Sequence, residues 1–181
     1  MHAFRQLRYI LFVSLILLSA GVHAGWRETL PDAQLIGGGE LRFFGFSVYS
    51  AQFWSQGEAS GAPLEQAEPF ALELTYQRSI SREDLVAASL KEIRRLAVKP
   101  LSAAQLAGWE REMMRAFVDV RSGDRITGVY QPGEGARFYV DDTLQHRVAD
   151  EAFARAFFSI WLDPRTRNPE LRSRLLGAAK S

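Results

Sequence analysis

The sequence predicts an α+β domain in which helices pack on an antiparallel sheet. Segments with the alternation of β-strands come first, two helical segments follow, and a hairpin precedes two more helices. The hairpin turn at 132–135 reads Pro-Gly-Glu-Gly, which is typical of a connection between neighbouring antiparallel strands. A chain of this length buries enough apolar surface for one such domain.

The strand segments are rich in aromatic and β-branched residues. Residues 41–54 predict one long strand with apolar side chains on both faces, so both faces are expected to be at least partly covered. Three glycines at 37–39 predict a bulge or tight turn before it. Residues 70–78 predict a second strand, because apolar residues at 70, 72, 74 and 76 point one way and polar residues at 73, 75 and 77 point the other. Shorter strands are expected at 125–131, 136–140 and 144–148.

Four helices are predicted from their start and stop signals. Ser81, Ser102 and Asp150 are N-cap residues that precede apolar residues at helical spacing. Asn168 precedes a proline at the first position of the last helix, and Gly177 ends that helix. The helices therefore fall between and after the strands, as the fold class requires.

The first 24 residues predict a cleavable signal peptide. Arg5 and Arg8 form a basic region, residues 9–18 are apolar apart from one serine, and Val-His-Ala at 22–24 suits signal peptidase. The apolar run is shorter than the roughly 20 residues that a bilayer span needs. We expect a secreted, periplasmic domain over residues 25–181 with no stable membrane span after cleavage. The alternative is an uncleaved N-terminal anchor.

Composition excludes several classes of function. The chain has no cysteine, so thiol nucleophiles, thiolate metal sites and disulfides are excluded, and His146 is the only histidine after residue 24. Residues 25–181 carry 20 Lys and Arg, two fewer than the whole chain, against 21 Asp and Glu, a net charge of 20 − 21 = −1. We therefore expect no metal, no cofactor and no nucleic-acid partner.

Four segments resemble the chalcone isomerase-like family in its bacterial secreted branch. They are the strand segment 39–49, which ends in Val-Tyr, the helix segment 80–96, the Ser-Gly-Asp-Arg-Ile segment 122–126 with its Pro-Gly turn, and the aromatic helix segment 156–162. Their order and spacing match across most of residues 33–177. The resemblance implies an open-faced β-sandwich, a long antiparallel sheet packed on a layer of helices.

The resemblance implies one of two functions. Some members cyclise chalcones, and others bind fatty acids in the cleft between sheet and helices. The plant enzymes use an Arg, a Thr, a Tyr and an Asn. In this sequence Phe44 stands near the Thr position, Ile80 or Ser81 at the Tyr position, and Ala87 or Ala88 at the Asn position. Arg42 is no clean match for the enzymes' Arg, and only Ser159 matches a hydroxyl position. This pattern weighs against flavanone chemistry.

Four residues are candidate ligand contacts, and no catalytic residue is assigned. Arg42 lies among apolar residues and is expected to hold a ligand carboxylate, unless it pairs with an acid such as Glu73 or faces solvent. Tyr49 and Tyr76 lie on adjacent predicted strands, where either hydroxyl completes that site or is satisfied within the core. Ser159 reaches a ligand or bonds to the preceding helical turn.

We expect non-catalytic binding of a fatty acid or similar small amphiphile. One alternative is an intramolecular lyase or isomerase acting on an unsaturated carbonyl compound, with Arg42 as electrophile and Ser159 or Tyr49 positioning a water. A second alternative is a protein-interaction module without a small-molecule pocket.

Overall fold

The computed structural model describes residues 25–57 and 62–177. The predicted signal sequence lies outside these residues. Six strands form one antiparallel sheet in sequence order: β1 (Gln34–Phe43), β2 (Phe46–Ser55), β3 (Phe70–Tyr76), β4 (Arg125–Gln131), β5 (Gly135–Val140) and β6 (Thr143–Val148). The helices are α1 (Trp26–Thr29), α2 (Arg82–Leu96), α3 (Ala103–Ala116), α4 (Glu151–Leu162) and α5 (Pro169–Leu175).

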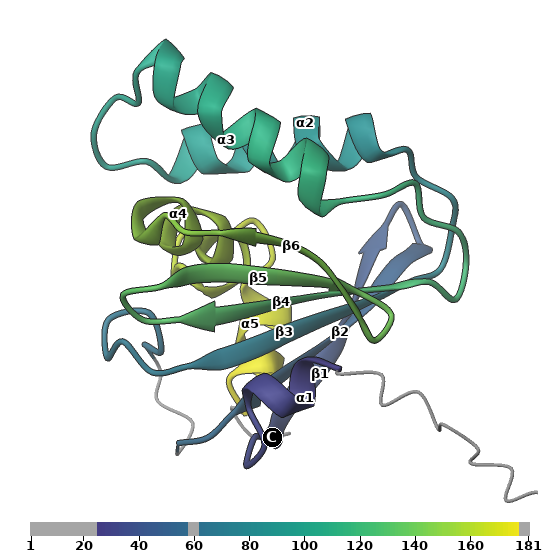
Figure 1. Ribbon diagram of the computed structural model, residues 1–181. Helices are drawn as coiled ribbons and strands as arrows, with labels where there is room; N and C mark the ends of the chain where they lie inside the picture. The colour runs from purple at the N-terminus through teal and green to yellow at the C-terminus, as the bar shows by residue number, and fades with distance from the viewer. Residues whose placement is uncertain (1–24, 58–61, 178–181) are drawn as a thin grey trace, which may run out of the picture.

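Two layers of helices lie on one side of the sheet, and one short helix lies on the other side. Figure 1 shows α2 and α3 side by side in the outer layer, with α4 between them and the strands. Helix α5 packs on β1, and α1 lies on the opposite face of the sheet. This is the predicted α+β, open-faced sandwich. Within the described ranges, no helix has the length and hydrophobicity that crossing a membrane requires.

The prediction of one long strand over residues 41–54 is wrong. The chain reverses at Phe44 and Gly45, which have φ of 48° and 82°, and β1 and β2 pair on either side of this two-residue turn. Positive φ at both central residues gives a turn whose twist matches that of the flanking strands. The apolar pattern continues through the turn, so it did not reveal where one strand ends and the next begins.

The predicted glycine-rich irregularity lies inside β1. The register of β1 against β2 shifts between Leu35 and Gly37, which is a bulge. A Cβ atom on Gly37 would lie 2.0 Å from the backbone oxygen of Arg174 in α5. Glycine at this position therefore allows the backbone of α5 to approach the sheet closely.

Three of the four predicted helix starts are confirmed by side-chain caps, and α5 begins after Asn168 as predicted but without such a cap. The hydroxyl of Ser81 accepts a hydrogen bond from the backbone N–H of Asp84, and the hydroxyl of Ser102 accepts one from Gln105, both at 3.1 Å. A carboxylate oxygen of Asp150 accepts from the N–H of Phe153 at 3.0 Å. Each cap satisfies a backbone donor that the first turn of a helix leaves free.

A second small core, on the α1 side of the sheet, was not predicted. Trp26 is fully buried there among residues that include Leu30, Val129 and Tyr139. Its indole N–H donates to Glu73 at 3.3 Å, and the Arg27 guanidinium lies 4.3 Å from the Trp26 ring centroid. The sheet is therefore covered on both faces near its centre.

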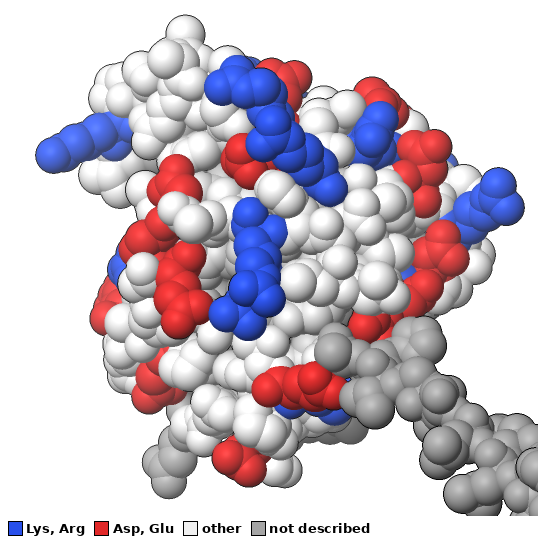
Figure 2. Space-filling view, in the orientation of Figure 1, with Lys and Arg blue, Asp and Glu red and all other residues white. Residues whose placement is uncertain are grey.

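Charged side chains are mixed over the visible surface. Figure 2 shows Lys and Arg interspersed with Asp and Glu, without a broad patch of one sign on this face. Many of these charges are paired, as in the Arg115–Glu112 and Arg137–Glu134 ion pairs, both at 3.1 Å or less. Such exposed pairs contribute little to stability.

Candidate functional site: an apolar cleft between sheet and helices

An apolar cleft of about 500 Å³ lies between the sheet and the helices α2 and α4. This volume falls within the range typical of small-molecule sites. The strands β1 to β5 and helix α4 supply its apolar and aromatic walls: Leu41, Phe43, Val48, Leu72, Leu74, Ile126, Phe138, Phe157, Phe158, Ile160 and Trp161. The cleft therefore offers an apolar ligand contacts from both layers.

Strand alternation explains which sheet residues reach the cleft. Leu72, Leu74 and Tyr76 occupy alternate positions of β3 and all line it, whereas Ala71, directly before Leu72, packs on the α1 side. Gly128 in β4 lines the cleft as well, and a Cβ there would lie 3.0 Å from the Phe158 ring. The absence of a side chain at this point lets the α4 aromatic ring lie directly on the sheet.

Two tyrosine hydroxyls are placed in this apolar surrounding. Tyr49 and Tyr76 are direct cross-strand partners, with ring centroids 6.0 Å apart in an edge-to-face arrangement. The indole N–H of Trp161 donates to the Tyr49 hydroxyl oxygen at 2.9 Å, which leaves the Tyr49 proton free for another acceptor. No described residue hydrogen-bonds to the Tyr76 hydroxyl. The pair can donate to a carbonyl or carboxyl oxygen.

Burial keeps both tyrosines protonated. Desolvation raises the pKa of Tyr49 to about 12, against the opposing effect of the Trp161 hydrogen bond. Desolvation, together with the neighbouring Tyr49, raises the pKa of Tyr76 further still. A group that titrates this far above neutral pH is a poor general base in neutral solution. Both hydroxyls therefore keep a proton that they can donate to a ligand.

These shifts predict a loss of stability in alkaline solution. An unfolded tyrosine ionises near pH 10, whereas the folded protein keeps Tyr49 protonated up to about pH 12. The free energy of unfolding is therefore unaffected by this shift below pH 10. It falls as the pH rises from the unfolded pKa through the folded pKa. We expect unfolding free energy to fall by about 1.4 kcal/mol per pH unit for each such tyrosine. Urea unfolding across this range, with Tyr49→Phe as the flatter control, measures the slope; equal slopes would contradict the assignment.

Charged residues lie only around the mouth of the cleft, among the described lining residues. They are Asp84, Lys91 and Glu92 of α2 and Arg167 after α4. Glu92 accepts from Arg95 at 2.8 Å and from Arg167 at 2.7 Å, so it ties α2 to the α4–α5 connection. Burial acts to raise the pKa of Glu92, but these two guanidinium groups outweigh it and lower the pKa.

Arg42 lies outside the cleft lining. Its side chain is 64% exposed, and its Nε donates to Glu40 at 2.7 Å. Glu40 also accepts from the Ser47 hydroxyl, and the hydrogen bonds from Ser47 and Arg42 lower its pKa. The expected alternative partner, Glu73, is buried on the α1 side of the sheet and lies 3.7 Å from Arg125 instead. The structure thus pairs Arg42 with an acid on its own strand.

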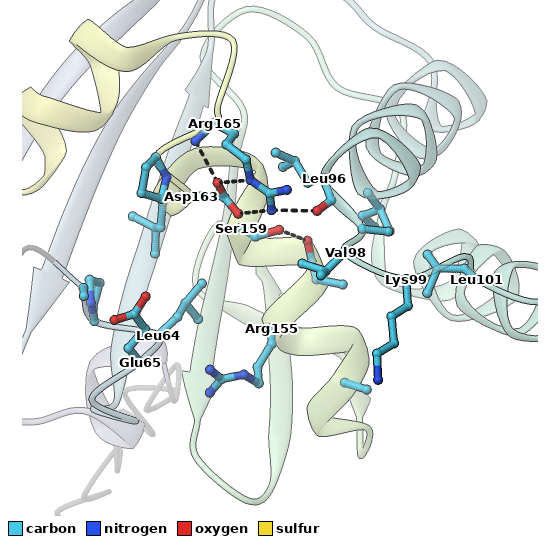
Figure 3. Close-up of a pocket in the computed structure, with 18 of the residues that line it drawn as sticks. Leu64, Glu65, Leu96, Val98, Lys99, Leu101, Arg155, Ser159, Asp163 and Arg165 are labelled. Carbon is cyan, nitrogen blue, oxygen red and sulfur yellow. Dashed lines mark hydrogen bonds and ion pairs between the residues drawn. The ribbon is translucent and has the colours of Figure 1, made fainter.

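Ser159 lines a different cavity. Its hydroxyl donates to the backbone oxygen of Ala156 at 2.6 Å, the helical back-bond that was the structural alternative. Figure 3 shows this second cavity, of about 560 Å³, between the start of α3, helix α4 and the segment at Leu64. Lys99, Arg155 and Arg165 bring charge to its lining.

The structure thus brings together two of the four candidate residues. Tyr49 and Tyr76 share the apolar cleft, and ligand contact by any of the four stays a prediction. Sequence reasoning missed Trp161 as the partner of Tyr49 and Glu92 as the link across the mouth. Trp161 was recognised as an inward aromatic residue, but its N–H acceptor, 112 positions away, left no local signal.

Comparison with known proteins agrees with the observed fold. The sequence model of the family described as chalcone isomerase-like matches residues 31–177. A crystal structure of a fatty-acid binding protein from Arabidopsis thaliana superposes with a TM-score of 0.63 at 10% identity, covering 81% of this chain and 87% of that one. Comparison with curated protein sequences finds no match. With the family match spanning most of the sequence, the chain belongs to the chalcone isomerase-like family.

Proposed function

We propose that this protein binds a fatty acid or a similar small amphiphile in the sheet–helix cleft without transforming it. The observation that carries the proposal is the apolar cleft with two buried tyrosines in its lining. Each methylene group moved from water into such a cleft contributes about 0.8 kcal/mol. The fatty-acid binding function of the Arabidopsis protein, which shares the fold, is consistent with this ligand class.

The polar groups fix the orientation of the ligand. The hydroxyls of Tyr49 and Tyr76 are the donors available to a carbonyl or carboxyl group inside the cleft. A carboxylate at the mouth would instead meet Lys91, because Arg167 is already paired with Glu92. Arg42, which the sequence favoured as the carboxylate partner, would have to leave Glu40 and turn toward the cleft. We therefore propose the tyrosine pair as the main head-group contact.

The described lining favours binding over catalysis. It includes no histidine, and burial raises the pKa values of its two tyrosines far above the ordinary value. Of the three groups expected in a lyase or isomerase, only Tyr49 lines the cleft. Turnover of a chalcone at a rate above that in buffer would contradict the non-catalytic proposal.

Native mass spectrometry tests ligand binding directly. The purified domain over residues 25–181 is expected to carry a lipid of discrete mass, or to bind a saturated fatty acid after delipidation. In a series of fatty acids of increasing chain length, the affinity should rise with each added methylene group until the cleft is full, because burial of apolar surface drives binding. Affinity that does not change with chain length would overturn the apolar-cleft proposal.

Replacing Tyr76 by phenylalanine should weaken binding without weakening the fold. The hydroxyl has no partner among the described residues, so its loss leaves no acceptor unsatisfied. Loss of one hydrogen bond of about 0.5–1.5 kcal/mol to the ligand corresponds to roughly 2- to 12-fold weaker binding. Titration with a fatty acid measures the change. Tyr139→Phe is the matched control, because that hydroxyl pairs with Thr29 on the other side of the sheet.

We also propose that residues 1–24 direct export to the periplasm and are then removed. The basic, apolar and small-residue regions occur in the order that signal peptidase recognises. Intact mass measurement of the protein recovered from a bacterial periplasmic fraction should give a chain that starts at Gly25. Protein retained in the cytoplasm with residues 1–24 attached would contradict this proposal.

A further inference from the structure

The β1–β2 turn carries an apolar surface that nothing in the described fold covers. Phe43, Phe44 and Phe46 are 63%, 86% and 72% exposed, and with Gly45 they form what we call the hairpin tip. The other large exposed apolar residues of the described ranges are scattered over the fold: Leu35, Val98 and Leu144. Single exposed apolar residues are ordinary, but three phenylalanines on one turn form a patch that indicates interaction.

Folding alone does not favour phenylalanine at this turn. Phe44 has a φ of 48°, in the left-handed region where a bulky side chain is a costly exception. Asparagine followed by glycine is the usual solution for a two-residue turn of this kind. The Phe43 and Phe44 rings contact one another edge to face, with 4.5 Å between their centroids. Together they form one apolar surface at the end of the hairpin. The sequence thus keeps an exposed ring where a polar residue would fold better.

The hairpin tip lies beside the mouth of the cleft. Phe43 belongs to both, because it lines the cleft and is also mostly exposed. Leu85 and Lys91 of α2 line the same cleft from the helical side. In Figure 1 this end of the hairpin projects at the right of the sheet, below the α2 layer. A partner that covers the hairpin tip therefore also lies next to the mouth of the cleft.

The size and charge of the tip favour a lipid bilayer over a protein. Three phenylalanines exposed to this extent present on the order of 400 Å², about half of what each partner contributes to a stable protein interface. Arg42 at the base of the tip is neutralised by Glu40, so an anionic partner is not required. The methylene stem and charged end of Arg42 suit the headgroup level of a membrane.

We infer that the hairpin tip inserts into the surface of a lipid bilayer and holds the cleft mouth against it. The apolar rings enter the acyl region, while Arg42 and Glu40 stay among the headgroups. An amphiphile could then pass between bilayer and cleft without crossing water. Membrane docking itself does not depend on the proposed ligand, because it rests on the exposed tip alone.

Co-sedimentation with vesicles of zwitterionic phosphatidylcholine tests the inference with delipidated protein. The unchanged protein should partition onto the vesicles, also in high salt. The double variant Phe44→Asn and Phe46→Ser should lose on the order of tenfold or more of this partitioning. Neither residue lines the cleft, so fatty-acid affinity should be unchanged. Val98→Ser, which removes an 87% exposed apolar residue elsewhere, should bind vesicles as before.

Two further measurements separate docking from folding and from self-association. Asparagine suits the conformation of residue 44, so the double variant should unfold no earlier than the unchanged protein. A Phe44→Trp variant should show fluorescence quenching by brominated lipids beyond that of the four native tryptophans. The inference is overturned if the unchanged protein ignores vesicles, if the double variant binds equally, or if sedimentation velocity shows a dimer that only the double variant lacks.

Discussion

Replacing Trp26 by alanine is expected to lower the free energy of unfolding by about 3–5 kcal/mol. The side chain is fully buried, and it joins α1 to the sheet beside Val129 and Tyr139. Its ring also contacts Trp54, with centroids 5.6 Å apart. Domains of this kind are stable by about 5–15 kcal/mol in total, so this one change would remove a large share.

The polar part of the Trp26 contact adds to this cost. The indole N–H donates to Glu73, a buried carboxylate that also accepts from Thr127 at 3.4 Å and lies 3.7 Å from Arg125. Removing one donor from a buried acceptor costs about 1–3 kcal/mol, less when other donors remain. The alanine variant therefore loses apolar contact and one of the groups that satisfy Glu73.

A series of variants distinguishes these contributions. Trp26→Phe keeps most of the apolar volume but removes the N–H, and should cost less than Trp26→Ala. Arg27→Ala removes only the cation that lies over the two indole rings, and should cost about 0.5–1 kcal/mol. Urea unfolding followed by far-ultraviolet circular dichroism measures all three without relying on tryptophan fluorescence. An unchanged midpoint for Trp26→Ala would show that α1 does not stabilise the sheet.

Elements defined by local rules were predicted well. The caps at Ser81, Ser102 and Asp150 are interactions between residues three apart, and the sequence contains both partners. The β4–β5 hairpin was predicted from its Pro-Gly turn. The closeness of Tyr49 and Tyr76 was predicted from their positions on two neighbouring strands. For the caps and the hairpin turn the determining chemistry lies within a few residues, and for the two tyrosines it lies in the alternation of each strand, so a pattern is enough to find them.

Two elements without a clear local signal in the sequence were missed. Helix α1 has only four residues, too few for a period, and it is held by Trp26 against strands more than 40 positions away. The turn at Phe44 and Gly45 was hidden because phenylalanine is not a usual turn residue and the flanking strands are equally apolar. Helix α1 is fixed by packing that no short window of sequence contains, whereas the turn is local but carries no usual turn signal at residue 44.

The position of Arg42 outside the cleft lining follows from strand geometry. The residue drew attention because the segment from Leu41 to Phe44 around it is otherwise apolar, yet successive side chains of a strand point to opposite faces. Leu41 and Phe43 line the cleft, and Arg42 between them therefore points away from it. The neighbours that made a buried cation plausible are the ones that place it on the other side.

Replacing Ala88 by tryptophan is expected to block the cleft and weaken fatty-acid binding by roughly 5- to 150-fold, the equivalent of an overpacking cost of about 1–3 kcal/mol. Ala88 lines the cleft from α2 while remaining exposed, so a large ring there can occupy the mouth without disturbing the core. Stability should change by no more than about 0.5 kcal/mol, as for other surface substitutions. Displacement of a fluorescent fatty acid gives the affinity.

The chain provides two matched controls for Ala88→Trp. Ala87 is equally exposed but lies about 100° around the helix and does not line the cleft, so Ala87→Trp should bind normally. Ala152 is an exposed alanine that lines the second cavity on α4. Loss of binding in Ala152→Trp, with Ala88→Trp unaffected, would move the ligand to that cavity and away from the tyrosine pair. Loss in Ala88→Trp alone is the result that the apolar cleft requires, because that cleft, and not the second cavity, has the hydroxyls of Tyr49 and Tyr76 in its described lining.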